Sequence, residues 1–486
     1  MNRDLASPAI RRAAAALAWL TLVAGCGGGG ETPAPAPEVG AGTPVSCLGV
    51  DVTHLNPLLV SPQGTPTGLC GLGGTKPCSD IVFALQLAGE LNAAVAVQHG
   101  LYQTTATIPL NKRVAVYGSC LFGDERDQKY RTVIHANPPP GAPAVSGNGI
   151  TGTVSGLVVI GKDASGANVA MALQNSNVTL SRTVLVAGKG PDGPPAPPLS
   201  AIAPRALSDH CYRPGGAPSN LIWGMVDPRT SSWIASIGGP GAGGDDTGPG
   251  GVGGRQGGPS IALFLVNSNA TASAPEYSRF VADSGGIGGP GQAGPSFGAG
   301  GGANSGGAGG NGGPSIGVAL VGASTWASDA SFAYASAPGP SGAGGAAGAD
   351  EDKCSGDPGA PGAPGGSASI YTYVTPSTLA AGQSLPPGLP LYSPNLQFQL
   401  MLQGDSNLCL SSAGRALWCS QTAGQAIFQA NMQTDGNFCM YPTQVGINAQ
   451  PFCSGTAGRP GAALAVQDDG HVQVIDAAGA VRWSVP

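Results

Sequence analysis

An internal repeat limits how this chain can fold more than any other feature of its sequence. The segment 258–261, Gly-Pro-Ser-Ile, recurs 55 residues later at 313–316. Each copy is followed by an apolar run, a turn rich in Ser, Asn and Thr, a second apolar run and a Gly-rich stretch. A repeat of this kind usually forms one supersecondary unit, which buries its apolar face only by stacking on its neighbours. We therefore expect a stack of equivalent coils.

Short β-forming runs fill the region before the repeat, at 95–97, 107–110, 114–118, 132–134 and 156–160, and residues 169–187 and part of 369–374 fit the same template. Very short strands at tight, regular spacing are more typical of a solenoid than of a sandwich. One segment differs, because Ile81, Leu85 and Ala88 recur at helical spacing. This spacing predicts a short capping helix over residues 81–91.

The glycine-bounded runs at 100–102, 114–118 and 156–161 resemble those of right-handed parallel β-helices of the pectin-lyase type. The resemblance implies an all-β fold over residues 47–380, in which successive coils add strands to shared parallel sheets. The Gly-rich stretches would then leave the stack at one corner as loops.

Glycine is abundant enough to raise two alternatives. The chain holds 82 Gly and 44 Pro among 486 residues, which borders on low-complexity composition. Collagen requires Gly at every third position, and only residues 356–365 keep that phase, over too few triplets for a triple helix. Disorder stays open for 238–258, 284–313 and 338–366, and we expect these segments to be mobile loops on an ordered stack.

The N-terminus has the pattern of a segment that is removed during export. Arg3, Arg11 and Arg12 precede an apolar stretch at 13–24, which is too short to span a bilayer. The stretch ends in Val-Ala-Gly-Cys at 23–26, which resembles the lipobox of bacterial lipoproteins. The resemblance implies a signal peptide over 1–25, a lipid on Cys26, a Gly/Pro-rich tether over 26–46 and, from Gly27, an outer-membrane address. The alternative is an ordinary signal peptide with a chance cysteine.

The cysteine count fits an exported protein. Of eleven cysteines, ten remain after Cys26, and an even number favours disulfides in an oxidising compartment. The pairs closest in sequence are the favoured partners: Cys70 with Cys78, Cys409 with Cys419, and Cys439 with Cys453. The pairing of Cys47, Cys120, Cys211 and Cys354 stays open.

Charge and residue chemistry point away from nucleic acid, metals and catalysis. The net charge is −6 and no basic patch is present, so we expect no nucleic-acid partner. The five histidines lack metal-ligand spacing and Asp245-Asp246 lacks a calcium repeat, so we expect no metal and no cofactor. A β-helix lyase or hydrolase needs clustered carboxylates or a base on adjacent coils. The charged candidates are few: Asp124, Glu125, Arg126, Asp127, Lys162, Asp163, Arg182, Glu276, Arg279 and Asp283. We therefore expect no enzymatic activity.

The composition changes near residue 382, where three quasi-repeats begin. They hold Gln403, Asp405 and Asn407; Gln433, Asp435 and Asn437; and Gln467, Asp469 and His471. Each is followed by an aromatic residue, Trp418, Phe452 or Trp483, which we expect to meet in a common core. On a strand, residues two apart share a face, so each triplet would present amide and carboxylate groups together. Such groups can clamp vicinal sugar hydroxyls, which both donate and accept.

The three repeats resemble the signature Gln-x-Asp-x-Asn-x-Val-x-Tyr of bulb-type, mannose-binding lectins. The resemblance implies a β-prism II domain over 382–486 that contains three small sheets. In the second repeat, Gln433 and Asn437 would bond sugar hydroxyls, Asp435 would accept from them, and Tyr441 would donate to the ring or cap it. Cys439 replaces the usual Val. The first repeat keeps Gln403, Asp405 and Asn407 but has Ser411 in place of Tyr, and the third departs at His471.

Together these features predict an exported, lipid-anchored protein with a Gly-rich β-helix and a C-terminal lectin domain. We expect it to bind mannose-like glycans or surface polysaccharide without catalysis, and to contact the membrane through its lipid. Two alternatives remain. One is a polysaccharide-active β-helix enzyme with an appended lectin module, and the other is a structural envelope protein whose lectin fold is vestigial.

Overall fold

The computed structural model describes residues 43–65, 70, 76–111, 115–122, 131–139, 141–161, 168–194, 225–227, 232–234, 254–273, 278–291, 307–328, 332–337, 358–373, 376–385, 388–425, 427–442 and 452–486. The predicted signal peptide, Cys26 and most of the predicted tether lie outside these residues, as do Cys211, Cys354 and Asp245-Asp246. Within the described ranges, no helix has the length and apolar character needed to cross a membrane.

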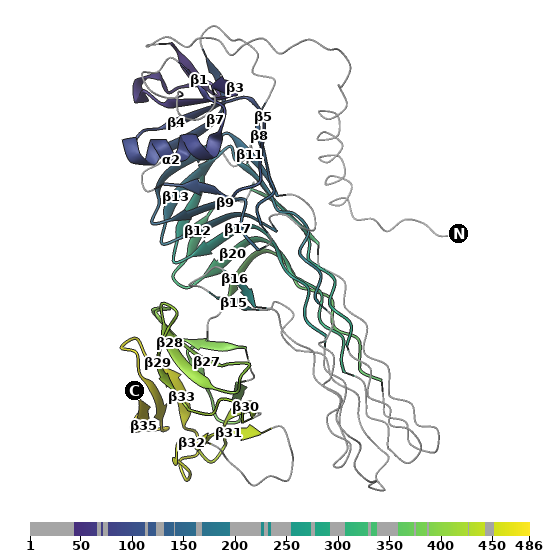
Figure 1. Cartoon of the computed structure of the whole chain (residues 1–486), viewed down its shortest axis with the longest axis vertical. Coiled ribbons are helices and arrows are strands. Elements are labelled where there is room, and N and C mark those ends of the chain that lie inside the picture. Colours follow the sequence, from purple (N-terminus) through teal and green to yellow (C-terminus); the bar gives the residue numbers. More distant parts are fainter. Residues whose placement is uncertain are drawn as a thin grey trace, which may run out of the picture.

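Strands from residues 45–373 form a stack of three sheets, which are parallel except where residues 45–51 pair antiparallel (Figure 1). The first sheet contains β1 (Val45–Cys47), β2 (Val50–Asp51), β3 (Leu58–Thr65), β4 (Val95–Gln98), β7 (Ala115–Phe122), β10 (Thr151–Ser155), β13 (Asn177–Ser181), β18 (Asn269–Ser273) and β21 (Thr325–Ala327). The second contains β5 (Gly100–Thr104), β8 (Thr132–Ala136), β11 (Leu157–Gly161), β14 (Val184–Val186), β19 (Arg279–Ser284) and β22 (Ala333–Ala337). The third contains β6 (Ile108–Leu110), β9 (Val145–Asn148), β12 (Val169–Gln174), β17 (Ser260–Val266), β20 (Ser315–Val321) and β23 (Ser367–Tyr373). A separate hairpin joins β15 (Met225–Asp227) to β16 (Ser232–Ile234).

Each coil takes one strand from the third, first and second sheets in that order, and the sequence repeat is one such coil. Ser260 pairs with Ser315 and Ile261 with Ile316, so β17 and β20 lie in the register that the repeat predicts. The stack is therefore a parallel β-helix-like fold, as expected from the sequence.

Serines at one corner explain the polar turn within each repeat. Ser176 Oγ accepts a hydrogen bond from the N–H of Ile150 at 3.0 Å. Ser268 Oγ accepts from the N–H of Ser176 at 3.0 Å, and Ser324 Oγ accepts from the N–H of Ser268 at 3.1 Å. The hydroxyls thus satisfy turn N–H groups that would otherwise be buried without a partner.

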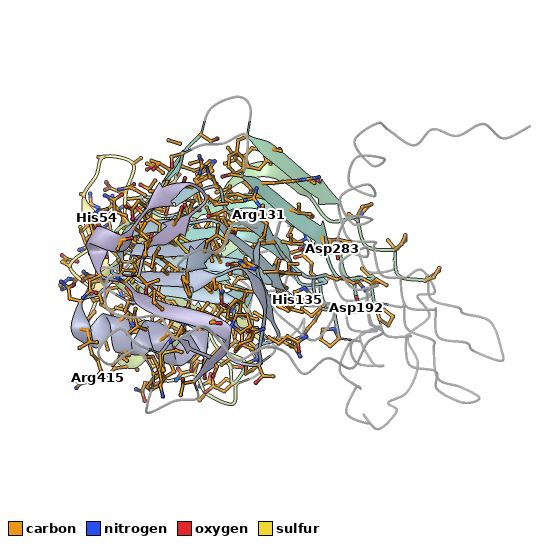
Figure 2. All side chains as sticks on the ribbon, turned by 90° about the horizontal axis from the view of Figure 1, so that it is seen from above. His54, Arg131, His135, Asp192, Asp283 and Arg415 are labelled. Atoms are coloured by element: carbon orange, nitrogen blue, oxygen red, sulfur yellow. A yellow bond between two sulfur atoms is a disulfide. The ribbon has the colours of Figure 1, made fainter. Side chains whose placement is uncertain are left out.

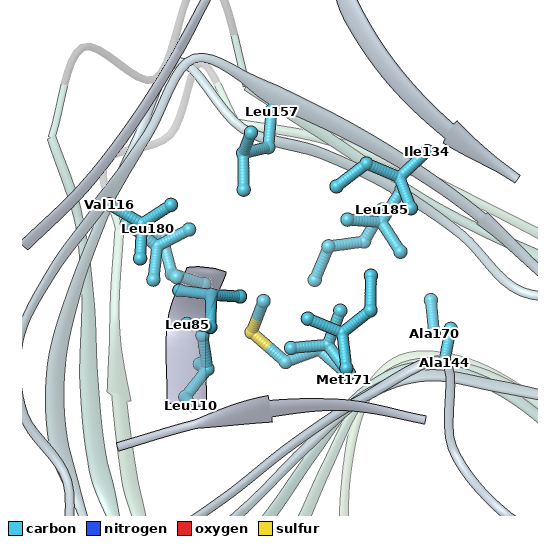
Figure 3. Packing of buried hydrophobic residues seen from close by; sticks show 14 of the residues in the cluster. Leu85, Leu110, Val116, Ile134, Ala144, Leu157, Ala170, Met171, Leu180 and Leu185 are labelled. Atoms are coloured by element: carbon cyan, nitrogen blue, oxygen red, sulfur yellow. The ribbon is translucent and has the colours of Figure 1, made fainter. Parts of the chain in front are cut away.

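Small and branched apolar side chains fill the inside of the stack. Alternate residues point inward, as Leu157 and Val159 do in β11, and they meet Leu180, Leu185 and Met171 from other strands (Figure 3). The helix α2 (Ile81–Leu91) covers one end of this core, which confirms the predicted capping helix. It begins where Asp80 Oδ1 accepts from the N–H groups of Val82 and Phe83, and its Leu85 packs into the core.

The Gly-rich segments project from one corner of the stack as extended legs (Figure 1). Outgoing legs, at 187–194 and 284–291, follow the second sheet, and returning legs, at 254–259, 307–314 and 358–366, precede the third. Hydrogen bonds join neighbouring legs at every third residue: the N–H groups of Gly309 and Gly312 donate to the carbonyls of Ala360 and Ala363, both at 2.8 Å. A three-residue period without internal bonds is polyproline II geometry. The Gly-rich segments therefore leave the stack at one corner, as expected, and their described parts are extended and hydrogen-bonded to one another.

Close packing of the legs explains why glycine recurs in them. A Cβ at Gly310 would collide with the carbonyl of Arg255, and one at Gly362 would collide with the carbonyl of Gly310. The collagen-like phase therefore has a structural cause in its described part, at Gly359, Gly362 and Gly365, although the described legs form no triple helix. Seen from above, Asp192 and Asp283 lie on the side of the stack that carries the legs (Figure 2). Asp192 and Lys189 form an ion pair at 3.1 Å, one turn apart on an outgoing leg.

Two disulfides lie near the capped end of the stack. Cys47 and Cys120 join β1 to β7, a pairing that the sequence left open. Cys70 and Cys78 join over a separation of 8 residues, as their proximity suggested.

Residues 376–486 form three antiparallel sheets of four strands each, which is a β-prism. One contains β26 (Pro390–Tyr392), β27 (Phe398–Leu402), β28 (Leu408–Ser412) and β29 (Arg415–Cys419). The next contains β25 (Ser384–Leu385), β30 (Ile427–Met432), β31 (Phe438–Pro442) and β32 (Phe452–Cys453). The last contains β24 (Thr378–Leu379), β33 (Ala463–Val466), β34 (Val472–Ile475) and β35 (Val481–Val485). Each quasi-repeat builds one sheet, and the lead-in before residue 393 adds one short strand to each.

The prism has its own apolar core, in which Leu408 and Phe438 are fully buried. Trp418, Phe452 and Trp483 meet there, as expected, with ring centroids 5.8, 5.9 and 6.1 Å apart and edge-to-face geometry. The prism is therefore the fold that the resemblance to bulb-type lectins implied.

Candidate functional site

Each quasi-repeat forms a tight turn between two strands of its sheet. In the second repeat, the N–H of Gln433 donates to the carbonyl of Asn437 at 2.9 Å, and the N–H of Gly436 donates to the carbonyl of Gln433 at 3.0 Å. Asp435 Oδ1 accepts from the N–H of Asn437 at 2.9 Å. Gly436 has φ +91°, a left-handed conformation that glycine adopts at little cost. These bonds reverse the chain between β30 and β31.

This geometry corrects the premise that Gln, Asp and Asn share one face of a strand. Strand β30 ends at Met432 and β31 begins at Phe438, so all three residues lie in the turn between them. The left-handed residue at 436 breaks the alternation of a strand. The turn itself, and not strand periodicity, brings the polar side chains together.

The side-chain oxygen of Asn437 accepts hydrogen bonds that stabilise the turn. Its Oδ1 accepts from Ser454 Oγ at 3.1 Å and from the N–H of Thr456 at 3.0 Å. Ser454 Oγ also accepts from the N–H of Phe438 at 3.0 Å and lies 2.7 Å from Thr456 Oγ1. In the described part of the chain, Asp435 Oδ2 and Asn437 Nδ2 make no hydrogen bond. Asp435 is exposed and Asn437 is half-buried, so an acceptor and a donor are available at the surface of this turn.

The first repeat has the same arrangement. Asp405 Oδ1 accepts from the N–H of Asn407 at 3.0 Å, and Asn407 Oδ1 accepts from Ser420 Oγ and from the N–H of Thr422, both at 3.2 Å. The sequence contains the signal for this support, because Ser-x-Thr follows the second cysteine in both repeats. The sequence analysis assigned no role to these residues.

The third repeat lacks this support. Asp469 Oδ1 accepts from the N–H of His471 at 3.1 Å and lies 3.1 Å from its Nδ1. The backbone bond from His471 is the main cause that lowers the pKa of Asp469 below its usual value, and the imidazole lowers it further. No Asn carboxamide faces out of this turn, which agrees with its departure from the sequence signature.

A disulfide lies behind each of the first two turns. Cys439 pairs with Cys453 directly across β31 and β32, and Cys409 pairs with Cys419 across β28 and β29. Cys439 is fully buried, and this sulfur takes the place of the Val of the signature. Gln403 Oε1 lies 3.6 Å from Cys409 Sγ. Tyr441 belongs to β31, but its side chain lies outside what the structure describes.

Three of the charged candidates of the stack, Arg182, Arg279 and Asp283, lie in the described ranges. Arg182 Nη1 donates to the carbonyl of Leu48 at 2.8 Å, which is a structural bond. Arg279 and Asp283 lie in β19, and Asp283 Oδ1 accepts from the N–H of Ser284 at 2.6 Å. Among described residues, no three His, Cys, Asp or Glu side chains gather where they could hold a metal ion. The remaining charged candidates lie outside the described ranges: Asp124, Glu125, Arg126, Asp127, Lys162, Asp163 and Glu276.

Comparison with known proteins finds similarity only to solved structures. No family model matches the chain, and no curated protein matches it. A monomeric monocot mannose-binding lectin from Gastrodia elata is 30% identical, with 22% of this chain and 94% of that one covered and a TM-score of 0.20. A domain-swapped lectin dimer from Mycobacterium smegmatis is 35% identical, with 22% and 95% covered and a TM-score of 0.13. The mannose-specific agglutinin of snowdrop (Galanthus nivalis) is 29% identical, with 20% and 87% covered and a TM-score of 0.18.

Proposed function

We propose that this protein binds mannose-like glycans, without transforming them, through the turns of its first two prism repeats. The proposal rests on how the side chains of the second turn use their polar atoms. Asp435 and Asn437 each use one oxygen to hold the backbone, and each keeps a second group, Oδ2 or Nδ2, for a ligand. An acceptor beside a donor suits adjacent sugar hydroxyls, which both donate and accept.

Mannose is named because the second repeat keeps every polar position of the lectin signature: Gln433, Asp435, Asn437 and Tyr441. The first repeat, with Gln403, Asp405 and Asn407, lacks the Tyr and is the weaker site. A single small-sugar site of this kind has a Kd near 1 mM, about −4 kcal/mol. Useful binding therefore needs many copies of the protein on one surface, where linked sites raise the overall affinity.

The setting that we propose is the bacterial cell surface. The four described disulfides indicate an extracytoplasmic protein. Beyond that, we propose that a lipid on Cys26 anchors the chain to the outer membrane and that the stack carries the prism outward for adhesion or recognition. Cys26→Ser is expected to move the protein from the membrane fraction to the soluble fraction, and unchanged fractionation would contradict the anchor.

A structural role for the prism is the second candidate, and one observation favours it. Asp435, Asn437 and their counterparts in the first repeat shape the turns whether or not a sugar binds. The same residues could therefore persist in an envelope protein whose lectin fold is vestigial.

A glycan array probed with the full chain separates the two candidates. Asn437→Asp keeps the Oδ1 acceptor for Ser454 and Thr456 and replaces only the outward donor with an acceptor. We expect the unmodified chain to bind mannose-containing glycans and the variant to lose at least tenfold in affinity. Asp469→Asn, in the third turn, is the matched control and should bind normally. Absence of binding by the unmodified chain would favour the structural role.

A further inference from the structure

The second prism turn has a cationic residue beside it, and the first turn has none at the same place. The N–H of Arg459 donates to the carbonyl of Asp435 at 2.7 Å. In the first turn, the N–H of Gly424 makes the equivalent bond to the carbonyl of Asp405, also at 2.7 Å. Residues 423–425 carry no charge. Arg459 is therefore a charge difference between two turns that share their other hydrogen bonds.

The side chain of Arg459 begins in contact with the centre of the second turn. A Cβ at Gly436 would lie 2.8 Å from the Cβ of Arg459. Gly436 stands between Asp435 and Asn437, whose Oδ2 and Nδ2 atoms are available to a ligand. Because the arginine side chain carries its guanidinium on a long, flexible stem, it can reach a group on a sugar that is bound to either neighbour.

No described residue pairs with this guanidinium. Arg459 is exposed, and its side chain makes no hydrogen bond or ion pair within the described ranges. By contrast, Arg482 pairs with Asp476 at 2.6 Å, and Arg182 donates to the carbonyl of Leu48 at 2.8 Å. A guanidinium presents a fork of N–H donors that suits the oxygens of phosphate and carboxylate groups.

We propose that Arg459 makes the second turn selective for mannose-like glycans that carry an anionic group, a phosphate or a carboxylate. The inference rests on the proposed function, because the sugar hydroxyls still bind Asp435 and Asn437. The anionic group accepts hydrogen bonds from the guanidinium at the same time, and this contact offsets its repulsion by the Asp435 carboxylate. The first turn has no such cation and gives anionic sugars no advantage.

A simpler role for Arg459 is to balance the charge of Asp435. That role would place the guanidinium on Asp435 Oδ2, and these two exposed side chains form no ion pair with each other. A general attraction of anions to the protein would not produce the preference either, since the chain has a net charge of −6. A preference for anionic sugars must therefore come from a local cation.

Titration calorimetry with the full chain tests the proposal. All proteins carry Asp405→Asn, which keeps the Oδ1 bond to the N–H of Asn407 but removes the outward acceptor of the first turn, so that the second turn dominates binding. The probes are methyl mannoside, a phosphorylated mannose and mannuronic acid. We expect at least one anionic probe to bind about threefold to tenfold more tightly than methyl mannoside, and this preference should shrink in concentrated salt. The probe that shows it identifies the substituent.

Three variants separate the charge of Arg459 from other effects. Arg459→Gln should abolish the preference and leave the affinity for methyl mannoside unchanged, whereas Arg459→Lys keeps the charge and should retain part of the preference. Arg415→Gln is the matched control, because it removes an exposed charge at the end of β28 that lies away from the first turn. Equal affinity for neutral and anionic sugars, or a preference that survives Arg459→Gln, would overturn this inference and leave the proposed function standing. Binding of no probe would overturn both.

Discussion

Substitution of Gly310 by Ala tests whether the Gly-rich legs are a packed structure. The added Cβ would fall on the backbone carbonyl of Arg255, which cannot move as a side chain can. Relief of the clash displaces the leg and breaks two bonds, from Gly310 to Gly289 at 2.9 Å and from Gly309 to Ala360 at 2.8 Å. Two lost hydrogen bonds cost about 2 kcal/mol in total. Overpacking strain adds roughly 1–3 kcal/mol.

The local free energy of opening for this leg should therefore fall by about 3 kcal/mol or more, which corresponds to roughly a hundredfold faster amide exchange. Hydrogen exchange followed by mass spectrometry, on peptides covering 254–259 and 307–314, measures this change. Gly404→Ala is the control, because no atom lies within 4 Å of a Cβ at that position. Unchanged exchange in the Gly310→Ala variant would show that the legs are loose, and would refute the packing argument.

Three further predictions concern the prism. Asn437→Ala removes the acceptor of two hydrogen bonds and should destabilise the prism by about 1–3 kcal/mol in thermal unfolding, whereas Asn437→Asp should not. Reduction of the Cys439–Cys453 disulfide should cost roughly 2–4 kcal/mol in denaturant unfolding at matched pH. Asp476 has a lowered pKa because of backbone hydrogen bonds, chiefly from Ala480, together with the Arg482 guanidinium. Its contribution to stability is therefore present above the usual value of 3.8 and is lost as pH falls below it, and Asp476→Asn should flatten that part of a melting-temperature profile.

The coil architecture was predictable because residues close together in the sequence form recognisable patterns in each coil. The Gly-Pro-Ser-Ile repeat predicts the register in which β17 pairs with β20, and the helical spacing of Ile81, Leu85 and Ala88 predicts α2. The order within the Gly-rich segments was not predictable. Their hydrogen bonds join residues such as Gly309 and Ala360, which lie far apart in the chain, so no local pattern reveals the pairing.

The candidate site was predictable in its residues but not in its geometry. A motif with Gln, Asp and Asn two residues apart suggested one face of a strand, and the structure places the residues in a turn. The left-handed conformation at Gly436 causes this difference, and Ser406 adopts the same conformation in the first repeat, with φ +77°. A serine at this position does not indicate a left-handed conformation in the sequence, because residues other than glycine rarely have positive φ. The hydrogen bonds from Ser454 and Thr456 to Asn437 likewise could not be predicted from the sequence.

Titration calorimetry with a mannose oligosaccharide tests the central claim most directly. The comparison is between the full chain and Asp435→Asn, which keeps the Oδ1 bond to the N–H of Asn437 and replaces only the outward Oδ2 with a donor. We expect the unmodified chain to bind with a Kd near 1 mM per site and the variant to bind at least tenfold more weakly, with the same melting temperature. Equal binding by both proteins would contradict the assignment of the second turn, and binding by neither would contradict the function itself.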